Sequence, residues 1–104
     1  MAELDAELAR VWDTHRAEID ARVARIDAAV AQLRDRALGD DTRDDARHAA
    51  HQLAGTCGTF GFGEASERAA ALELGLTGAP SPGDAARLTQ LAAALRAALP
   101  EAQS

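Results

Sequence analysis

Apolar residues recur at steps of three and four along most of the chain, which is the spacing of one face of an α-helix. The polar segment Asp13–Arg16 interrupts the first such stripe. We therefore expect a short helix that ends near Thr14 and a longer helix after it, rather than one continuous helix. The stripe consists of Leu4, Leu8, Val11/Trp12, Ile19, Val23, Ile26, Val30 and Leu33.

The next apolar stripe predicts a helix from about Arg43 to Gly58. Gly39 is the expected C-cap of the preceding helix, because glycine readily adopts the left-handed conformation found there. The segment Asp40–Thr42 offers N-cap candidates for the new helix, since its short side chains accept hydrogen bonds from free backbone N–H groups. Its inward positions would be Ala46, Ala49/Ala50, Leu53 and Cys57.

Two further helices are predicted after this one. The segment Phe60–Gly63 suits a tight turn with two aromatic anchors, and the helix that follows would bury Ala65, Ala69, Leu72 and Leu76. The segment Thr77–Gly83 has the composition of a loop. Ser81–Asp84 then reads as an N-cap serine, a proline at the first helical position and an acid at the third. The last helix would bury Leu88, Leu91, Leu95 and Leu99, and Pro100 would end it.

These elements predict an all-α protein, an antiparallel four-helix bundle with a short additional N-terminal helix. No strand pattern, repeat or linker interrupts the sequence, so residues 1–104 are expected to form a single domain. Hydrophobic residues make up 47% of the chain and aromatic residues only 3%. The core is therefore expected to consist mostly of alanine and aliphatic side chains, which let helices pack closely.

Composition excludes several classes of function. The formal net charge of −6 argues against a nucleic acid or an anionic membrane as the partner. All 11 basic residues are arginines, so Schiff-base chemistry and the lysine-containing phosphate loop are excluded. The single cysteine, Cys57, cannot form an internal disulfide, and the first residues lack a signal-peptide pattern. There is no run of about 18 apolar residues. We expect a soluble, cytoplasmic protein and a monomer.

One histidine lies on the predicted outer face of the third helix. With about 100° of rotation per residue, His51 lies about 160° from the buried Leu53, so it should face solvent. Gly55 and Gly58 share that outer face, as does Arg47. Glycine inside a helix lowers its stability by roughly 0.5–1 kcal/mol relative to alanine, so the presence of two glycines here needs an explanation. We interpret the two glycines as a docking surface that lets a large partner approach the imidazole.

A carboxylate is predicted to orient this imidazole. The chain reverses after Phe62, and at about 1.5 Å per residue the segment Ala70–Leu74 returns to the level of His51. Glu73 lies beside the inward stripe, from which its side chain can reach the neighbouring helix. If it accepts the Nδ1–H of the ring, Nε2 keeps a free lone pair, as a nucleophilic histidine requires.

The stretch "AHQLAGTCGTFGF" (Ala50–Phe62), together with Leu72 and Glu73, resembles the signature of histidine phosphotransfer (HPt) domains. It is most similar to the phosphotransfer domain of the chemotaxis histidine kinase. The resemblance implies that His51 accepts a phosphoryl group at Nε2 and that Glu73 hydrogen-bonds the ring. It also implies exchange with aspartates of response-regulator receiver domains or with a histidine kinase.

The sequence departs from the family pattern at Ala54, where HPt domains usually carry lysine or arginine. Arg47, one turn before His51, is the nearest cation on the same face and is a candidate substitute. Gln52 is a candidate amide donor to the phosphoryl group.

We therefore expect a free-standing phosphocarrier that is not itself an enzyme, with no cofactor and with Mg²⁺ bound only by the partner receiver domain. The alternative is an HPt-like interaction module that binds and inhibits a kinase or receiver without carrying phosphate, which Ala54 favours. A metal-binding helical protein is a third possibility, with Asp44, His48 and His51 as a weak ligand set.

Overall fold

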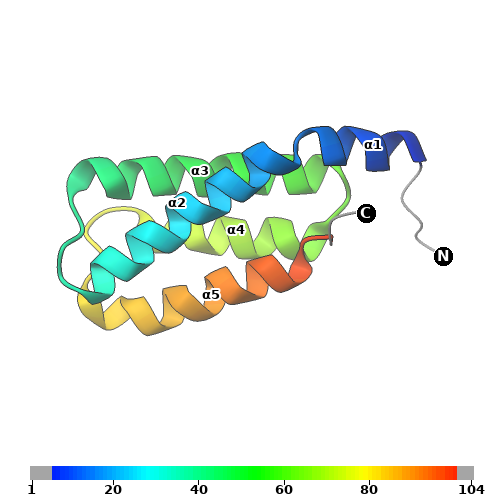
Figure 1. Cartoon of the computed structure of the whole chain (residues 1–104). Coiled ribbons are helices and arrows are strands. Elements are labelled where there is room, and N and C mark those ends of the chain that lie inside the picture. Colours follow the sequence, from blue (N-terminus) through cyan, green and yellow to red (C-terminus); the bar gives the residue numbers. More distant parts are fainter. Residues whose placement is uncertain (1–5, 101–104) are drawn as a thin grey trace.

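The computed structural model describes residues 6–100, and this part of the chain is helical throughout apart from its turns (Figure 1). No strand occurs between residues 6 and 100, which confirms the all-α prediction. A one-turn 3-10 helix, η1 (Pro82–Asp84), precedes the last helix. The α-helices are α1 (Ala6–Thr14), α2 (Arg16–Arg34), α3 (Asp40–Thr59), α4 (Gly63–Leu76) and α5 (Ala85–Ala98).

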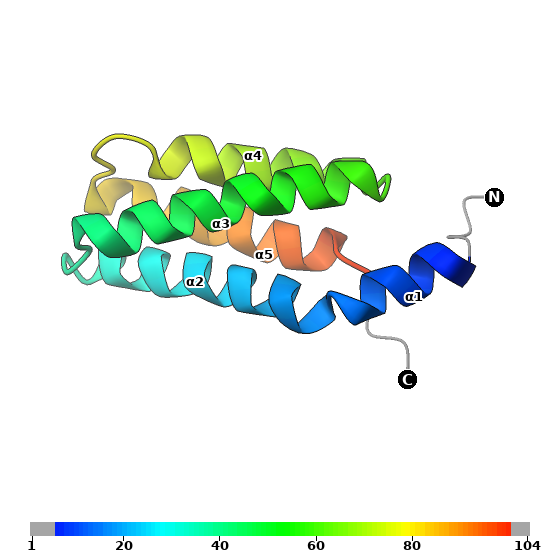
Figure 2. The same ribbon diagram turned by 90° about the horizontal axis from the view of Figure 1, so that it is seen from above.

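Helices α2 to α5 form the predicted four-helix bundle. Helix α2 packs against α3 and α5, and α4 packs against the same two helices, so that the four helices make a closed ring. Short connections place consecutive helices side by side in antiparallel directions (Figures 1 and 2). Helix α1 continues roughly along the direction of α2 and projects beyond the end of the bundle.

The core is built from alanine and aliphatic side chains, as the composition predicts. No buried polar or charged residue occurs in the described part of the chain. The inward positions predicted for the third and fourth helices are almost completely buried, which confirms both stripes; they are Ala46, Ala49, Ala50, Leu53 and Cys57 in α3 and Ala65, Ala69, Leu72 and Leu76 in α4. Leu88 and Leu95 of α5 are buried, whereas Leu91 and Leu99 are partly exposed.

The first two helices are separate, as predicted. Helix α1 ends at Thr14, and His15 forms the turn, with its backbone N–H donating to the carbonyl oxygen of Trp12 at 3.0 Å. The apolar stripe of α1 is only partly buried, however: Trp12 contacts the bundle, whereas Leu8 and Val11 remain 42% and 45% exposed. Part of the predicted stripe therefore does not reach the core, because α1 projects past the bundle. Leu4 lies outside the described residues.

The α2–α3 connection differs from the sequence prediction. Gly39 is not the C-cap of α2; that position is Asp35, and Arg36 adopts the left-handed conformation with φ of 60°. Gly39 is extended, with φ of −88°, and is the N-cap of α3. Helix α3 therefore begins at Asp40, earlier than expected, and the N-cap candidates Asp40–Thr42 lie in its first turn. There the two aspartates interact favourably with the helix dipole.

The predicted start of the last helix is confirmed at Ser81. The carboxylate of Asp84 accepts hydrogen bonds from the backbone N–H of Ser81 at 2.9 Å and from its hydroxyl at 3.2 Å. Both hydrogen bonds favour the ionised carboxylate and so lower the pKa of Asp84. The bond from the Ser81 backbone has the larger effect and the bond from its hydroxyl the smaller. Pro82 occupies the first helical position. The first turn is a 3-10 turn, and α5 continues directly from it.

An aromatic cluster joins α1 to the α3–α4 turn. The ring of Trp12 makes edge-to-face contacts with both Phe60 and Phe62, with centroid distances of 5.0 and 4.8 Å. The two phenylalanine rings are parallel to each other. Gly61 separates the two phenylalanines and has a φ of 84°, a backbone conformation that residues with a side chain rarely adopt. The glycine therefore permits the sharp reversal of the chain between α3 and α4. The two aromatic anchors predicted at this turn thus hold the only large aromatic residue of α1.

Candidate functional site

His51 lies near the middle of α3 and faces outward. Its side chain is 66% exposed, whereas Leu53, two residues further along the helix, is completely buried. The prediction from the sequence that His51 faces solvent is therefore confirmed. A large molecule can reach this imidazole without any rearrangement of the bundle.

Glu73 of α4 holds the imidazole from the side. Its Oε2 lies 3.0 Å from Nδ1 of His51, although the two residues are 22 positions apart in the sequence. The Glu73 side chain is 28% exposed, so the contact is partly shielded from water. An ionised carboxylate can only accept a hydrogen bond, so in the neutral ring this contact places the proton on Nδ1 and the lone pair on Nε2. The structure thus forms the histidine–carboxylate pair predicted from helix geometry.

A hydrogen bond between α3 and α4 involves a residue that the sequence analysis did not identify. The hydroxyl of Ser66 donates a hydrogen bond to the carbonyl oxygen of Ala54 at 2.8 Å. This bond crosses from α4 to α3 one turn after His51 and supports the axial position of the helix that carries Glu73. The sequence signal was available: Ser66 lies about 90° from the buried stripe of α4, on the same side as Glu73.

The two glycines near His51 have different surroundings. A side chain at Gly55 would meet no atom within 4 Å, so this position is open, as predicted. Gly58 is also exposed, but a Cβ there would lie 3.5 Å from the hydroxyl oxygen of Ser66. The expectation that Gly58 faces open solvent was incomplete, because it lies at the seam between α3 and α4. Only Gly55 leaves the helix surface bare on all sides.

The two candidate phosphoryl-stabilising residues flank His51 on α3. Arg47 and Gln52 are both partly exposed, and within residues 6–100 neither makes a hydrogen bond or ion pair. Arg47 lies one turn before His51, and Gln52 lies on the side of α3 that faces α2. Neither side chain is therefore held away from His51 by another polar group in the described part of the chain.

Other polar residues of α3 do not add to the site. No three His, Cys, Asp or Glu side chains come together as metal ligands within the described residues, so Asp44, His48 and His51 do not form a preassembled metal site. Cys57 is buried, and desolvation raises the pKa of its thiol to about 11. The thiol therefore stays protonated at neutral pH and acts as a small apolar core group, as predicted.

Fold and site together define a class: a four-helix bundle with a solvent-exposed imidazole on one helix that contacts a carboxylate of the adjacent helix. The family model described as Hpt domain matches residues 10–101, and the chain belongs to this family. No curated protein and no solved structure matches the chain, so its closer similarity to the chemotaxis kinase domain stays a prediction.

Family membership confirms the resemblance seen in the sequence and gives the chain its general role. Hpt domains take part in phosphotransfer in two-component signalling, as phosphocarriers and not as catalysts, and their partners are kinases and receiver domains. None of the described helices is both long enough and apolar enough to cross a bilayer.

Proposed function

We propose that this protein accepts a phosphoryl group on Nε2 of His51 and exchanges it with the aspartates of receiver domains in a phosphorelay. The observation that supports this proposal best is the contact between Nδ1 of His51 and Glu73 at 3.0 Å, on an imidazole that is otherwise open to solvent. A structural histidine has no need of a free Nε2 on the outside of a helix.

The chemistry follows from this tautomer. The Nε2 lone pair of His51 attacks the phosphorus of an aspartyl phosphate, the P–N bond forms, and the P–O bond to the aspartate breaks. The electron pair of that bond returns to the aspartate as a carboxylate. The ring then carries Nδ1–H and a phosphoryl group on Nε2, so it bears a positive charge. Glu73 stabilises this charge and retains its hydrogen bond throughout. The reverse transfer uses the same steps in the opposite order.

The phosphoryl group itself needs charge neutralisation in the transition state. We propose that Arg47 supplies part of it from α3 and that the side-chain amide of Gln52 donates a hydrogen bond. The remainder would come from Mg²⁺ in the aspartate pocket of the receiver domain. The protein would then contribute the nucleophile, its orienting carboxylate and an accessible surface, and it would need no cofactor of its own.

The direct test uses a receiver domain carrying radiolabelled phosphate. Wild-type protein should acquire label that is acid-labile and base-stable, as expected for phosphohistidine. His51→Gln should acquire none, with little change in helicity or melting temperature, because an exposed side chain contributes little packing energy. His48→Gln is the matched control: an exposed histidine of the same helix, one turn away, whose loss should leave transfer mostly intact.

Label on the His51→Gln protein would refute the assignment of the acceptor. If the wild-type protein binds the receiver but takes up no label, the alternative of a non-phosphorylated inhibitory module would be favoured instead.

A further inference from the structure

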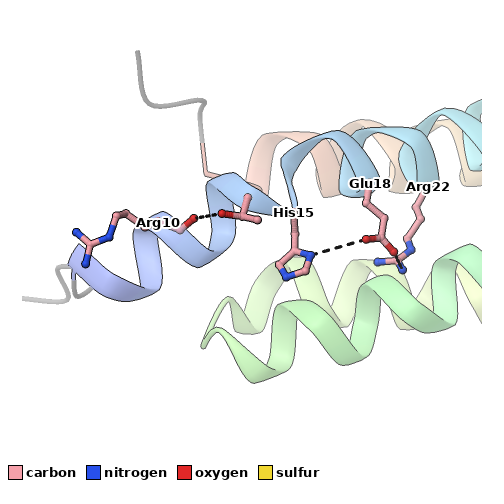
Figure 3. Close-up of polar contacts among 5 residues, drawn as sticks. Arg10, His15, Glu18 and Arg22 are labelled. Atoms are coloured by element: carbon pink, nitrogen blue, oxygen red, sulfur yellow. Dashed lines mark hydrogen bonds and ion pairs between the residues drawn. The ribbon is translucent and has the colours of Figure 1, made fainter.

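Arg22 of α2 is a charged side chain held against α3. It points toward α3 together with Glu18, as Figure 3 shows, and the two side chains form an ion pair. The Arg22 side chain is only 14% exposed, whereas that of Glu18 is 55% exposed. Removing a cation from water is unfavourable, and an ion pair with an exposed partner returns little of that free energy. The ion pair alone therefore does not account for the position of Arg22.

Arg22 lines an open hollow of about 690 Å³ on the surface between α2 and α3. Glu18 of α2 and Gln52 and Thr56 of α3 line it as well. The two helices run antiparallel, so the order of residues along α2 is reversed along α3 (Figures 1 and 2). Glu18 is therefore level with Thr56, and Arg22, one turn further along α2, is level with Gln52. Because Gln52 directly follows His51, Arg22 lies at the level of the proposed phosphoryl acceptor.

Gly55 leaves the surface between Arg22 and His51 open. Counted from His51, Gly55 is rotated about 40° around α3 and Gln52 about 100° in the same direction, which is the direction of α2. A Cβ at Gly55 would meet no atom within 4 Å. Glu73 contacts the ring from the other side, from α4, and does so through Nδ1. A guanidinium group from α2 can therefore approach a phosphoryl group on Nε2 across the bare glycine.

The Arg22 guanidinium has hydrogen-bond donors to spare. It carries five N–H groups, and within residues 6–100 its contact with Glu18 involves only Nη2. The other N–H groups can donate to phosphoryl oxygens in the paired geometry that guanidinium groups form with phosphate. Arginine stays charged throughout the physiological pH range, so Arg22 gains and loses no proton during transfer. The bonds that form and break at phosphorus are those of the proposed function.

On these grounds we propose that Arg22 binds the phosphoryl group on Nε2 of His51 and neutralises part of its charge. The inference rests on the proposed function. It gives the phosphoryl group two cations of this chain, Arg47 from the side of α4 and Arg22 from the side of α2. Glu18 is then a positioning residue that keeps the guanidinium at the hollow before the phosphoryl group arrives. Arg22 supplies, from another helix, the charge that Ala54 lacks.

The test labels the protein with phosphoramidate, a small donor that brings no aspartate pocket and no Mg²⁺, so the charge must be neutralised by this chain. Arg22→Gln should lower the labelling rate about tenfold, because a hydrogen bond between charged groups is lost from a partly exposed site. In the labelled protein, the same substitution should raise the pKa of the phosphoryl group by about 0.5–1 unit, since a nearby cation favours the dianion. Phosphorus NMR at varied pH measures this pKa.

Three variants of α2 separate the charge at the phosphoryl group from other effects. Arg34→Gln removes one exposed charge on the α5 side of the same helix and should change neither the labelling rate nor the phosphoryl pKa. Glu18→Gln breaks the same ion pair as Arg22→Gln but leaves the guanidinium in place, so the rate should fall only about twofold. Arg22→Lys keeps a charge without the paired donors, and its rate should lie between those of the wild type and Arg22→Gln.

The outcomes distinguish this inference from the proposed function. If neither phosphoramidate nor a phosphorylated receiver labels the wild-type protein, the proposed function is wrong and the inference fails with it. If only the receiver labels it, the same variants are compared with the receiver as donor. If the wild type is labelled and Arg22→Gln equals it in rate and in phosphoryl pKa, Arg22 does not bind the phosphoryl group, while the proposed function stands.

Two further results would also overturn the inference. Equal losses in Arg22→Gln and Glu18→Gln would show that the ion pair supports the structure and that the guanidinium has no part in the chemistry. Should circular dichroism show that Arg22→Gln is unfolded, Arg22→Met keeps an apolar stem against α3 and removes only the charge. Labelling of the folded Arg22→Met protein at the wild-type rate would then refute a role for Arg22 at the phosphoryl group.

Discussion

Replacement of Glu73 by alanine removes the carboxylate that accepts the Nδ1–H of His51 at 3.0 Å. A hydrogen bond to a charged group contributes about 1.5–3 kcal/mol when it is well shielded. Here the histidine side chain is 66% exposed and the glutamate 28%, so solvent weakens the contact, and we take about 1.4 kcal/mol as a realistic value. That figure corresponds to a loss of about tenfold in the rate of transfer, since 1.4 kcal/mol is a factor of 10.

The loss should come from chemistry and not from folding. The Glu73 side chain is partly exposed and lies outside the core, so its removal creates no core cavity and the melting temperature should change by only a few degrees. Glu73→Gln keeps an acceptor oxygen without the charge and should lose less than Glu73→Ala. Glu67→Ala, at an exposed acid of the same helix that makes no hydrogen bond or ion pair with His51, should transfer at the wild-type rate.

The assay is a single-turnover transfer from a labelled receiver, with label on His51 followed over time. Transfer by Glu73→Ala at the wild-type rate would show that the carboxylate is a plain surface charge. An equal loss in Glu67→Ala would show that net charge, and not the contact with Nδ1, controls the rate.

Two further substitutions test the surroundings of His51. Arg47→Ala should lower the steady-state amount of phosphohistidine severalfold, and Ala54→Lys should restore or exceed it, as measured by retained label; if neither substitution has an effect, stabilisation comes from Arg22 or from the partner. Gly58→Arg should stay folded and gain up to about 1 kcal/mol in unfolding free energy, because its Cβ would make only ordinary contact with Ser66 and arginine is the better helix former. Transfer from a receiver to the Gly58→Arg protein should fall sharply, whereas phosphoramidate, a small phosphoryl donor, should still label His51. Receiver transfer at the wild-type rate would mean that no partner covers the seam between α3 and α4.

The contact between His51 and Glu73 was predictable because it depends only on regular helix geometry and on the length of one turn. The rotation of about 100° per residue fixes which face of α3 carries His51, and a short turn fixes which part of α4 returns to its level. Both rules hold well inside long helices with clear apolar stripes. The buried positions of α3 and α4, from Ala46 to Leu76, follow for the same reason.

Features that depend on neighbouring elements were not predictable in this way. The stripe of α1 shows which residues are apolar, but not that the helix projects past the bundle and leaves Leu8 and Val11 exposed. At the α2–α3 connection several residues are plausible caps, and the left-handed conformation of Arg36 decides between them. The angular count for Gly58 likewise ignores the adjacent helix, whose Ser66 lies within contact distance.

The break at His15 and the projecting α1 have a consequence for how such a protein can change over time. The groups proposed for chemistry lie on α2, α3 and α4, whereas Leu8 and Val11 lie on a nine-residue helix that is joined to α2 by a single turn residue. Substitutions on the outer side of α1 can therefore accumulate without altering the contact between His51 and Glu73, provided that Trp12 keeps its place against the two phenylalanines. The outer surface of α1 would then diverge between copies of such a gene while the position of Glu73 against His51 stays the same.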